Sequence, residues 1–105
     1  MVALNSDSSV KKIKGNNRPI VGEKDRTRIL AGLESVSYVT LFKDDTPFKV
    51  IHSLKPDVLV KGADWNTNTI VGADFVKGYG GSVLTIEFIK GRSTTNLIKK
   101  IAHAF

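Results

Sequence analysis

The chain has 105 residues, of which 16 are lysine or arginine and 10 are aspartate or glutamate, giving a formal net charge of +6. It has no cysteine, so disulfide bonds are excluded, and no apolar run approaches the roughly 18 residues of a membrane helix. The composition, with 41% hydrophobic residues, predicts a single soluble, cytoplasmic domain over residues 1–105. The basic excess favours nucleotides or sugar phosphates as partners. Because the basic residues are scattered, nucleic acid is disfavoured, and no membrane partner is expected.

The first half of the chain alternates predicted strands and helices. In order, we expect a short buried strand (residues 1–5), a helix (from Ser6 or Asp7), a loop (14–19), a helix (from about Glu23) and a strand (38–42). A further helix is indicated by Thr46 as its cap and Pro47 at its first helical position. Two helices are predicted to bury apolar stripes, formed by Ile29, Leu30 and Leu33 and by Pro47, Val50, Ile51 and Leu54.

The second half continues the same alternation. We expect a strand (57–61), a loop (62–66), a helix (73–79) that ends at Gly80-Gly81, a strand (83–88) and a final helix. The unbroken apolar centre of residues 57–61 is typical of a parallel strand covered on both faces. Strands that alternate with helices throughout predict an α/β fold with a parallel sheet.

The last predicted helix begins at three hydroxyl residues, Ser93-Thr94-Thr95. Apolar residues recur at helical spacing from about Thr94, so Ser93 falls at the N-cap, where its oxygen can accept a backbone N–H. The free N–H groups, the helix dipole and the nearby cations Lys90 and Arg92 together favour a bound anion. A predicted strand leads directly into this helix, which is where open α/β sheets bind their ligands. The alternative is an ordinary helix cap.

Two loops carry further candidates. In residues 61–65, Asp64 could hold a ribose hydroxyl or a base edge while Trp65 packs on the nucleotide, or the segment is a plain glycine turn. Lys14 and Arg18 could clamp a phosphate, with Arg18 giving a bidentate contact, or could lie on a solvated surface loop. These candidates are all consistent with an anion-binding domain.

Neither histidine stands in a metal-binding or catalytic pattern. Neither His52 nor His103 has a metal-ligand or base partner at helical spacing, and the sequence contains no P-loop, dinucleotide fingerprint, nucleophile elbow or zinc spacing. Composition and spacing therefore predict an anion-binding α/β domain without a resident metal.

Seven stretches, read together and in order, carry a more specific signal. They are Asn5 to Val10, Lys14-Gly15 with Arg18-Pro19, Asp25-Arg26, Asp44 to Pro47, Lys55 to Asp64, Val71 to Ala73 and Gly91 to Thr95. This combination, which covers essentially the whole chain, resembles the nucleotidyltransferase domain of bifunctional ADP-heptose synthases. More widely, it is similar to the cytidylyltransferase-like superfamily.

The resemblance implies a Rossmann-like parallel sheet with flanking helices. It also implies transfer of AMP from ATP, with Mg²⁺, to D-glycero-β-D-manno-heptose 1-phosphate, giving ADP-heptose and pyrophosphate for lipopolysaccharide core synthesis. A sugar kinase domain elsewhere in a longer protein and a homo-oligomer are further implied partners. By position, the implied catalytic residues are Lys14 and Arg18, and the implied substrate-binding residues are Asn5 and Asp7. The implied nucleotide-binding residues are Lys61, Gly62, Asp64, Trp65, Gly91, Arg92, Ser93, Thr94 and Thr95.

Two features depart from the family pattern. Ala63 stands where the family has a second glycine, and the family's first strand with its His-x-Gly-His segment has no counterpart in these residues. In the family that strand is central, between the strands that contain Val2 and Val58. We therefore expect a gap in the sheet, a changed strand order or pairing across a dimer, and a chain that is inactive alone.

Two other functions stay open at this stage. One is a cytidylyltransferase that uses CTP and a polyol phosphate. The other is a non-catalytic module that binds nucleotide or contributes an assembly surface.

Overall fold

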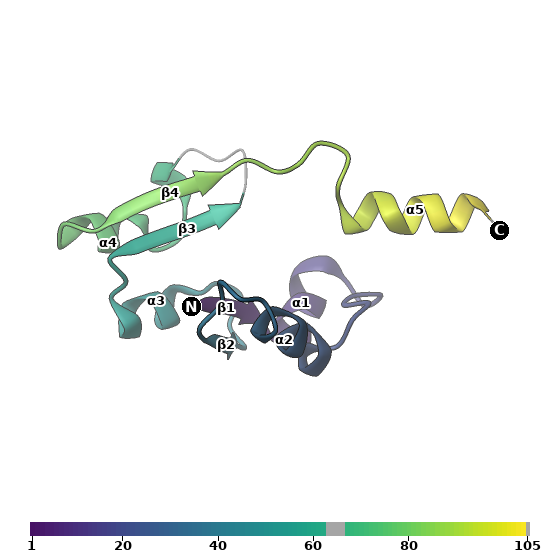
Figure 1. The fold of residues 1–105 in the computed structure, drawn as a ribbon, viewed down its shortest axis with the longest axis horizontal. Helices are drawn as coiled ribbons and strands as arrows, with labels where there is room; N and C mark the ends of the chain where they lie inside the picture. The colour runs from purple at the N-terminus through teal and green to yellow at the C-terminus, as the bar shows by residue number, and fades with distance from the viewer. Residues whose placement is uncertain (63–66, 105) are drawn as a thin grey trace. The chain divides into compact units, whose positions relative to one another are not determined.

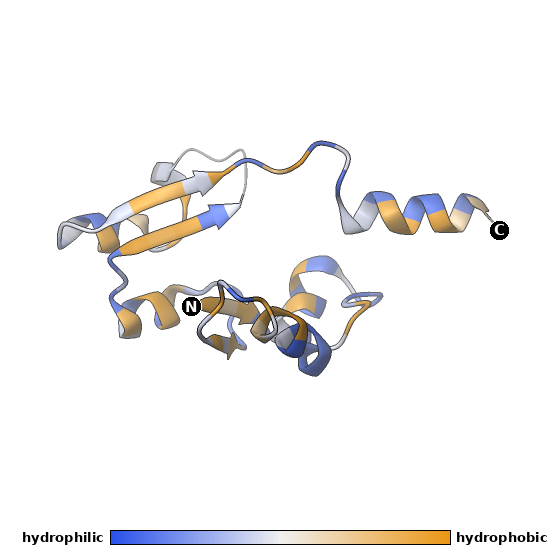
Figure 2. Cartoon of the chain, viewed as in Figure 1, coloured by the Kyte–Doolittle hydropathy of each residue, from blue (hydrophilic) through white to orange (hydrophobic). Residues whose placement is uncertain are grey.

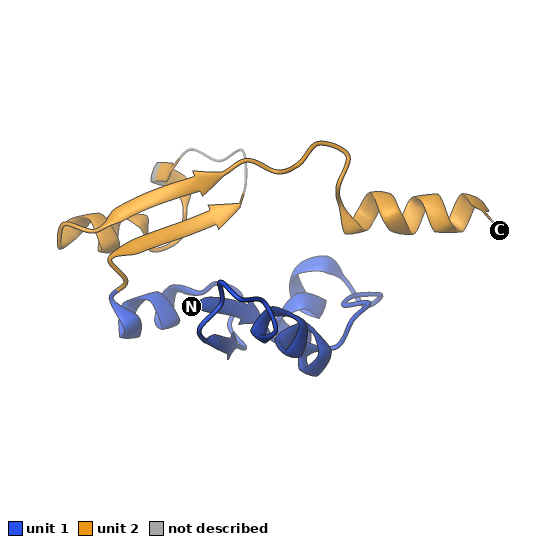
Figure 3. Cartoon of the chain, viewed as in Figure 1, with its two compact units in different colours: residues 1–55 blue, residues 56–105 orange. Residues whose placement is uncertain are grey.

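The computed structural model describes residues 1–62 and 67–104, and the chain forms two compact units (Figures 1 and 3). Unit 1 comprises Met1–Lys55 and unit 2 comprises Pro56–Phe105. Both units are built from short parallel strands and helices, which confirms the predicted α/β class. The assignment of all residues to one domain stays a prediction.

Unit 1 is a pair of strands with helices packed against it. Its elements are β1 (Val2–Asn5), α1 (Asp7–Lys14), α2 (Glu23–Ala31), β2 (Val39–Phe42) and α3 (Phe48–Leu54). The two strands run parallel, with Val2 opposite Val39 and Asn5 opposite Phe42. Helix α2 packs against both strands. This arrangement places the carboxyl ends of β1 and β2 side by side, directly before α1 and the loop that follows β2 (Figure 1).

A small polar cluster fixes these two strand ends. Ser6, one of the two caps that the sequence left open, is the N-cap of α1, and its Oγ accepts a hydrogen bond from the backbone N–H of Ser9 at 3.2 Å. The completely buried Ser9 hydroxyl donates to the carbonyl oxygen of Asp44 at 2.8 Å and accepts from Nδ2 of Asn5 at 3.0 Å. One hydroxyl therefore links the end of β1 to the segment after β2.

Ser9→Ala is expected to lower the free energy of unfolding by about 1–3 kcal/mol, because it removes both hydrogen bonds of a completely buried hydroxyl. Ser8→Ala is the matched control, since Ser8 is exposed and shares only one hydrogen bond, with Ser6. Urea denaturation of the two variants checks the prediction. Equal stability of both would contradict it.

Two details of unit 1 differ from the sequence-based expectation. Pro47 is the N-cap of α3, not its first helical residue, and no side chain caps this helix, so the predicted Thr46 cap is wrong. The predicted apolar stripes are only partly buried: Ile51 of α3 is buried as predicted and Leu54 is 47% exposed, whereas on α2 Ile29 is 63% and Leu33 is 51% exposed. A sheet of two strands offers too little apolar surface to cover both stripes.

Unit 2 contains a second pair of parallel strands. Its elements are β3 (Val58–Gly62), the short 3-10 helix η1 (Thr67–Thr69), α4 (Ala73–Gly78), β4 (Ser82–Ile86) and α5 (Thr94–Ala104). Val58 lies opposite Ser82, and Gly62 lies opposite Ile86. Helix α4 packs on the sheet, and the small core consists of Ile70, Ala73, Val76 and Val83.

A tight turn connects α4 to β4. The N–H of Gly81 donates to the carbonyl oxygen of Val76 at 2.9 Å, and the N–H of Ser82 donates to that of Asp57 at 2.8 Å. The Tyr79 hydroxyl donates to the carbonyl oxygen of Pro56. Partial desolvation, and then the charge of Asp57, raises the pKa of Tyr79 above its ordinary value, so this hydroxyl keeps its proton. These bonds hold the end of α4 against the start of β3.

Strand β3 is not covered on both faces, which corrects the prediction made from its apolar centre. Val58 is 49% exposed and Val60 is 48% exposed, and Leu84 and Ile86 on β4 are exposed as well. Because successive side chains point to opposite faces, α4 covers only the face that carries Val83. Figure 2 shows that most of both strands is hydrophobic.

The parallel pairing is confined to two separate sheets. Within the described ranges, β1 pairs only with β2, and β3 pairs only with β4. One edge of each strand is therefore unpaired, and unpaired strand edges are natural places for a further strand to bind.

Candidate functional site

An open cavity of about 510 Å³ lies in unit 1 beside the first turns of α1. Its lining residues are Asp7, Ser8, Lys11, Asn16, Asn17, Arg18, Pro19 and Gly22. One wall is the start of α1, and the other is the loop that joins α1 to α2. The α1 wall contributes the cation Lys11, and the loop contributes Arg18. The lining also includes the hydroxyl residue Ser8 and the amide residues Asn16 and Asn17. This combination suits an anionic ligand that also carries hydroxyl groups, such as a sugar phosphate.

The cavity brings together some of the predicted site residues. Asp7 and Arg18 both line it, whereas Lys14 is exposed at the last turn of α1 and lies outside the lining. The side chain of Asn5 is used within the fold, because its Nδ2 donates to Ser9. The predicted roles of these residues stay predictions.

Sequence reasoning did not select Lys11, which is the cation on the α1 wall. The signal for it was present in the spacing. Lys11 lies four residues after Asp7, and residues four apart share one face of a helix. Once Ser6 is recognised as the N-cap, Asp7, Ser8 and Lys11 are the residues on the face that begins the helix.

A second open cavity, of about 660 Å³, lies along the first turns of α2 and shares Asp7 and Gly22 with the first. Its lining adds the carboxylates of Glu23 and Asp25. Its lining also includes two cations, Lys24 and Arg28, but with Asp7 the carboxylates outnumber them. In the first cavity the cations Lys11 and Arg18 outnumber the one carboxylate, so that cavity is better suited to a phosphate.

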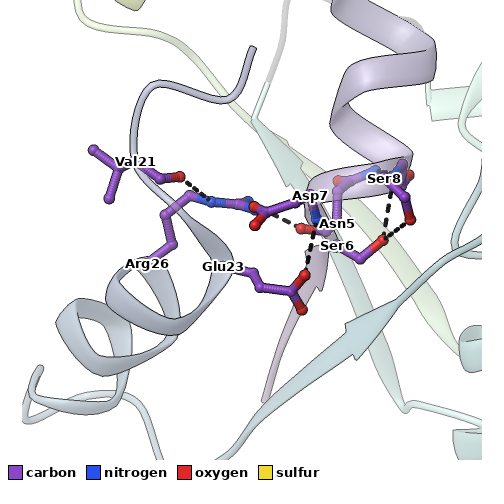
Figure 4. Close-up of polar contacts among 8 residues, drawn as sticks. Asn5, Ser6, Asp7, Ser8, Val21, Glu23 and Arg26 are labelled. Carbon is purple, nitrogen blue, oxygen red and sulfur yellow. Dashed lines mark hydrogen bonds and ion pairs between the residues drawn. The ribbon is translucent and has the colours of Figure 1, made fainter. Parts of the chain in front are cut away.

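Arg26 of α2 connects the walls of the first cavity (Figure 4). Its Nη2 donates to Oδ1 of Asp7 at 2.8 Å, its Nη1 donates to the carbonyl oxygen of Asn5 at 2.9 Å, and its Nε donates to that of Val21 at 2.9 Å. The backbone N–H of Asp7 donates in turn to Oε1 of Glu23 at 3.3 Å. The start of α1 is therefore linked to α2 by a donor on each helix: Arg26 of α2 donates to Asp7, and the N–H of Asp7 donates to Glu23.

In unit 2, the predicted N-cap of the last helix is confirmed. Oγ of Ser93 accepts a hydrogen bond from the backbone N–H of Asn96 at 3.0 Å, and α5 begins at Thr94. Gly91 has a φ of +80°, which is the left-handed region that glycine tolerates, and it turns the chain before Arg92. Gly91, Arg92 and the three hydroxyl residues that open the helix are exposed. The nucleotide role of this segment stays a prediction.

The other predicted nucleotide residues lie at the end of β3. Lys61 is exposed, and a Cβ built on Gly62 would lie 3.0 Å from Cε1 of Phe88, so the close neighbour of this glycine is an aromatic ring. Asp64 and Trp65, with Ala63, lie outside the described residues.

Searches for a metal site and for a membrane span give no candidate in residues 1–62 and 67–104. No group of three or more histidine, cysteine, aspartate or glutamate side chains in these ranges could hold a metal ion. No helix there combines the length and the apolar character needed to cross a membrane.

Comparison with known families identifies the chain. Residues 1–100 match the sequence model of the family described as Cytidylyltransferase-like. The chain belongs to this family. The match confirms the resemblance found in the sequence and supports a nucleotidyltransferase.

Individual relatives in this family are similar along the whole chain. The bifunctional protein HldE of Geobacter metallireducens is 49% identical over 105 residues, which are 100% of this chain and 21% of that protein. HldE of Caulobacter vibrioides is 52% identical over 101 residues, covering 96% of this chain and 21% of the relative. HldE of Gluconobacter oxydans is 49% identical over 104 residues, covering 99% and 22% respectively. The chain thus spans about a fifth of the length of these relatives.

Proposed function

We propose that this chain transfers AMP from ATP to D-glycero-β-D-manno-heptose 1-phosphate, giving ADP-heptose and pyrophosphate. The observation that carries the proposal is the identity of 49% to a bifunctional HldE protein over all 105 residues. The cavity with Lys11 and Arg18 supports it, because this cavity suits a sugar phosphate. The net charge of +6 favours both anionic substrates.

In the proposed reaction, an oxygen of the acceptor phosphate attacks the α-phosphorus of ATP. The bond from that phosphorus to the oxygen bridging to the β-phosphate breaks, and pyrophosphate leaves. No covalent protein intermediate is needed, so the protein contributes positioning and charge stabilisation. Arg18 and Lys11 hold the acceptor phosphate, and the backbone N–H groups at Ser93, Thr94 and Thr95 receive the phosphates of ATP.

We include Mg²⁺ in the proposal as a component of the Mg·ATP substrate. In the proposal the ion is bound through the phosphates of ATP, since Mg²⁺ is usually held by substrate phosphates and water together with one or two carboxylates. No step of the proposed reaction depends on a protein-bound metal.

For the whole protein, we propose a further strand that uses the unpaired edges of β1 and β3 and completes a Rossmann-like sheet. The exposed side chains of Val58 and Val60 support this proposal, because a completed sheet with a second helical layer would cover them. The chain alone is then inactive. A sugar kinase domain accounts for the second activity that the word "bifunctional" indicates in the relatives.

The test is an assay of pyrophosphate release with Mg·ATP and heptose 1-phosphate, on the whole protein and on this chain alone. We expect release by the whole protein only. Equal rates for the two would contradict the proposed inactivity of the chain. No release from the whole protein would contradict the proposed reaction and favour a non-catalytic module. Substituting CTP and a polyol phosphate tests the alternative that the family description favours, and faster turnover of CTP would overturn the assignment of ATP.

A further inference from the structure

The side chain of Arg26 makes three hydrogen bonds beside the cavity lined by Lys11 and Arg18. Its three donors bind the carbonyl oxygens of Asn5 and Val21 and the carboxylate of Asp7, at 2.8–2.9 Å. The Arg26 side chain is only 18% exposed, although its ion-pair partner Asp7 is 43% exposed. It is held inside the fold and does not line the cavity itself.

These three bonds reach both walls of the cavity (Figure 4). Asn5 and Asp7 form the junction from which α1 starts, and α1 carries Lys11. Val21 lies in the loop that carries Arg18, and the next residue, Gly22, lines the cavity. One guanidinium group therefore links the two walls, together with the hydrogen bond from the Asp7 N–H to Glu23.

The same ion pair has an electrostatic consequence. Asp7 lines the cavity, and its unpaired carboxylate would repel a phosphate held between the two cations. The guanidinium of Arg26 neutralises this carboxylate at 2.8 Å. An arginine stays charged at all physiological pH values, and its planar fork fits several acceptors at once, which a lysine cannot match.

We propose that Arg26 is a positioning residue for the acceptor phosphate. It holds α1 and the 15–22 loop at the separation at which Lys11 and Arg18 contact the same phosphate, and it cancels the charge of Asp7 beside that phosphate. The inference rests on the proposed function, since it assigns the acceptor to this cavity.

The test compares Arg26→Ala, Arg26→Lys and the control Arg28→Ala in the whole protein. Arg28 lies on the same helix, is exposed, and its side chain makes no hydrogen bond or ion pair with the described residues. We expect Arg26→Ala to raise the KM for heptose 1-phosphate about 10-fold or more, while the KM for ATP changes less than about 2-fold. Arg26→Lys recovers part of this loss, and Arg28→Ala behaves as the wild type. An unchanged acceptor KM, or equal rises for both substrates, overturns the inference.

A second measurement separates this inference from the proposed reaction. Inorganic phosphate is titrated into the wild type and the variants, and binding is followed by the NMR shifts of the side-chain amides of Asn16 and Asn17, which line the cavity. Weaker phosphate binding in Arg26→Ala supports the inference even if the wild type shows no turnover. Equal binding in the wild type and Arg26→Ala overturns it. If Arg26→Ala does not fold, Arg26→Lys carries the same comparison.

Discussion

Gly81→Ala is expected to lower the free energy of unfolding of unit 2 by about 3 kcal/mol, because the added methyl group has no space. A Cβ at this position would lie 2.6 Å from Cγ1 of Val76, 2.9 Å from the Val76 carbonyl oxygen and 3.1 Å from the Asp57 carbonyl oxygen. Both oxygens are fixed by the hydrogen bonds of the turn, from Gly81 and Ser82. Relief of the contact requires α4 to move away from the sheet and break these bonds. The completely buried Val76 would lose its packing as a result.

Gly78→Ala is the control for this prediction. Gly78 ends α4, and a Cβ there would meet nothing within 4 Å. Since alanine is the better helix former by about 0.5–1 kcal/mol, this variant is expected to be neutral or slightly more stable. Urea denaturation with a probe in unit 2 measures both variants. If Gly81→Ala is as stable as Gly78→Ala, the close packing of α4 on β3 and β4 is wrong.

The sequence predicts those features of the fold that depend on interactions between residues close together in the chain. The sequence predicts an N-cap at Ser93 and another at Ser6 or Asp7, and Ser6 and Ser93 each accept the backbone hydrogen bond expected of a cap. Capping depends on a side chain and the three residues that follow it, so it can be inferred without knowledge of the rest of the chain. The failure at Thr46 and Pro47 is a shift of one residue, which is common at helix ends.

Burial could not be predicted in the same way, because it depends on which elements pack together. The apolar centre of β3 indicated a strand covered on both faces, yet Val58 and Val60 are exposed on the face that α4 leaves open. Periodicity shows which residues can be buried. It does not show whether a partner covers them.

The candidate site shows the same limit. Arg18 was selected from its loop, and the structure places it in a cavity with Asp7. Lys14 lies three residues after Lys11 on the same helix face, so spacing does not distinguish them. The choice depends on how far along α1 the cavity extends, and only Lys11 of the two lines it. The role of Arg26 could not be inferred, since its acceptors in Asn5 and Asp7 are 21 and 19 residues away in the sequence.

Replacing the cations of the cavity is expected to have the largest effect on the proposed reaction. Arg18→Ala and Lys11→Ala should each lower kcat/KM for the acceptor by about 10- to 100-fold, since hydrogen bonds to charged groups contribute about 1.5–3 kcal/mol. Lys14→Ala and Lys12→Ala should change it by less than about 3-fold, because exposed charges outside the site act only through a screened field. All four cations lie in residues 11–18. Each of the four single variants therefore removes one positive charge from the same short segment.

The order of these effects decides between two positions for the acceptor phosphate. A large loss of kcat/KM in Lys11→Ala with a small loss in Lys14→Ala supports the cavity of about 510 Å³ as the acceptor site. Of these two lysines, only Lys11 lines that cavity. The reverse order would restore the role that the resemblance implies for Lys14, and it would exclude this cavity as the acceptor site. The double variant of Lys11 and Arg18 gives a further criterion. Two cations that bind one phosphate share a partner. The free-energy change from kcat/KM in the double variant should therefore differ from the sum of the changes in the single variants, whereas changes at independent sites would add.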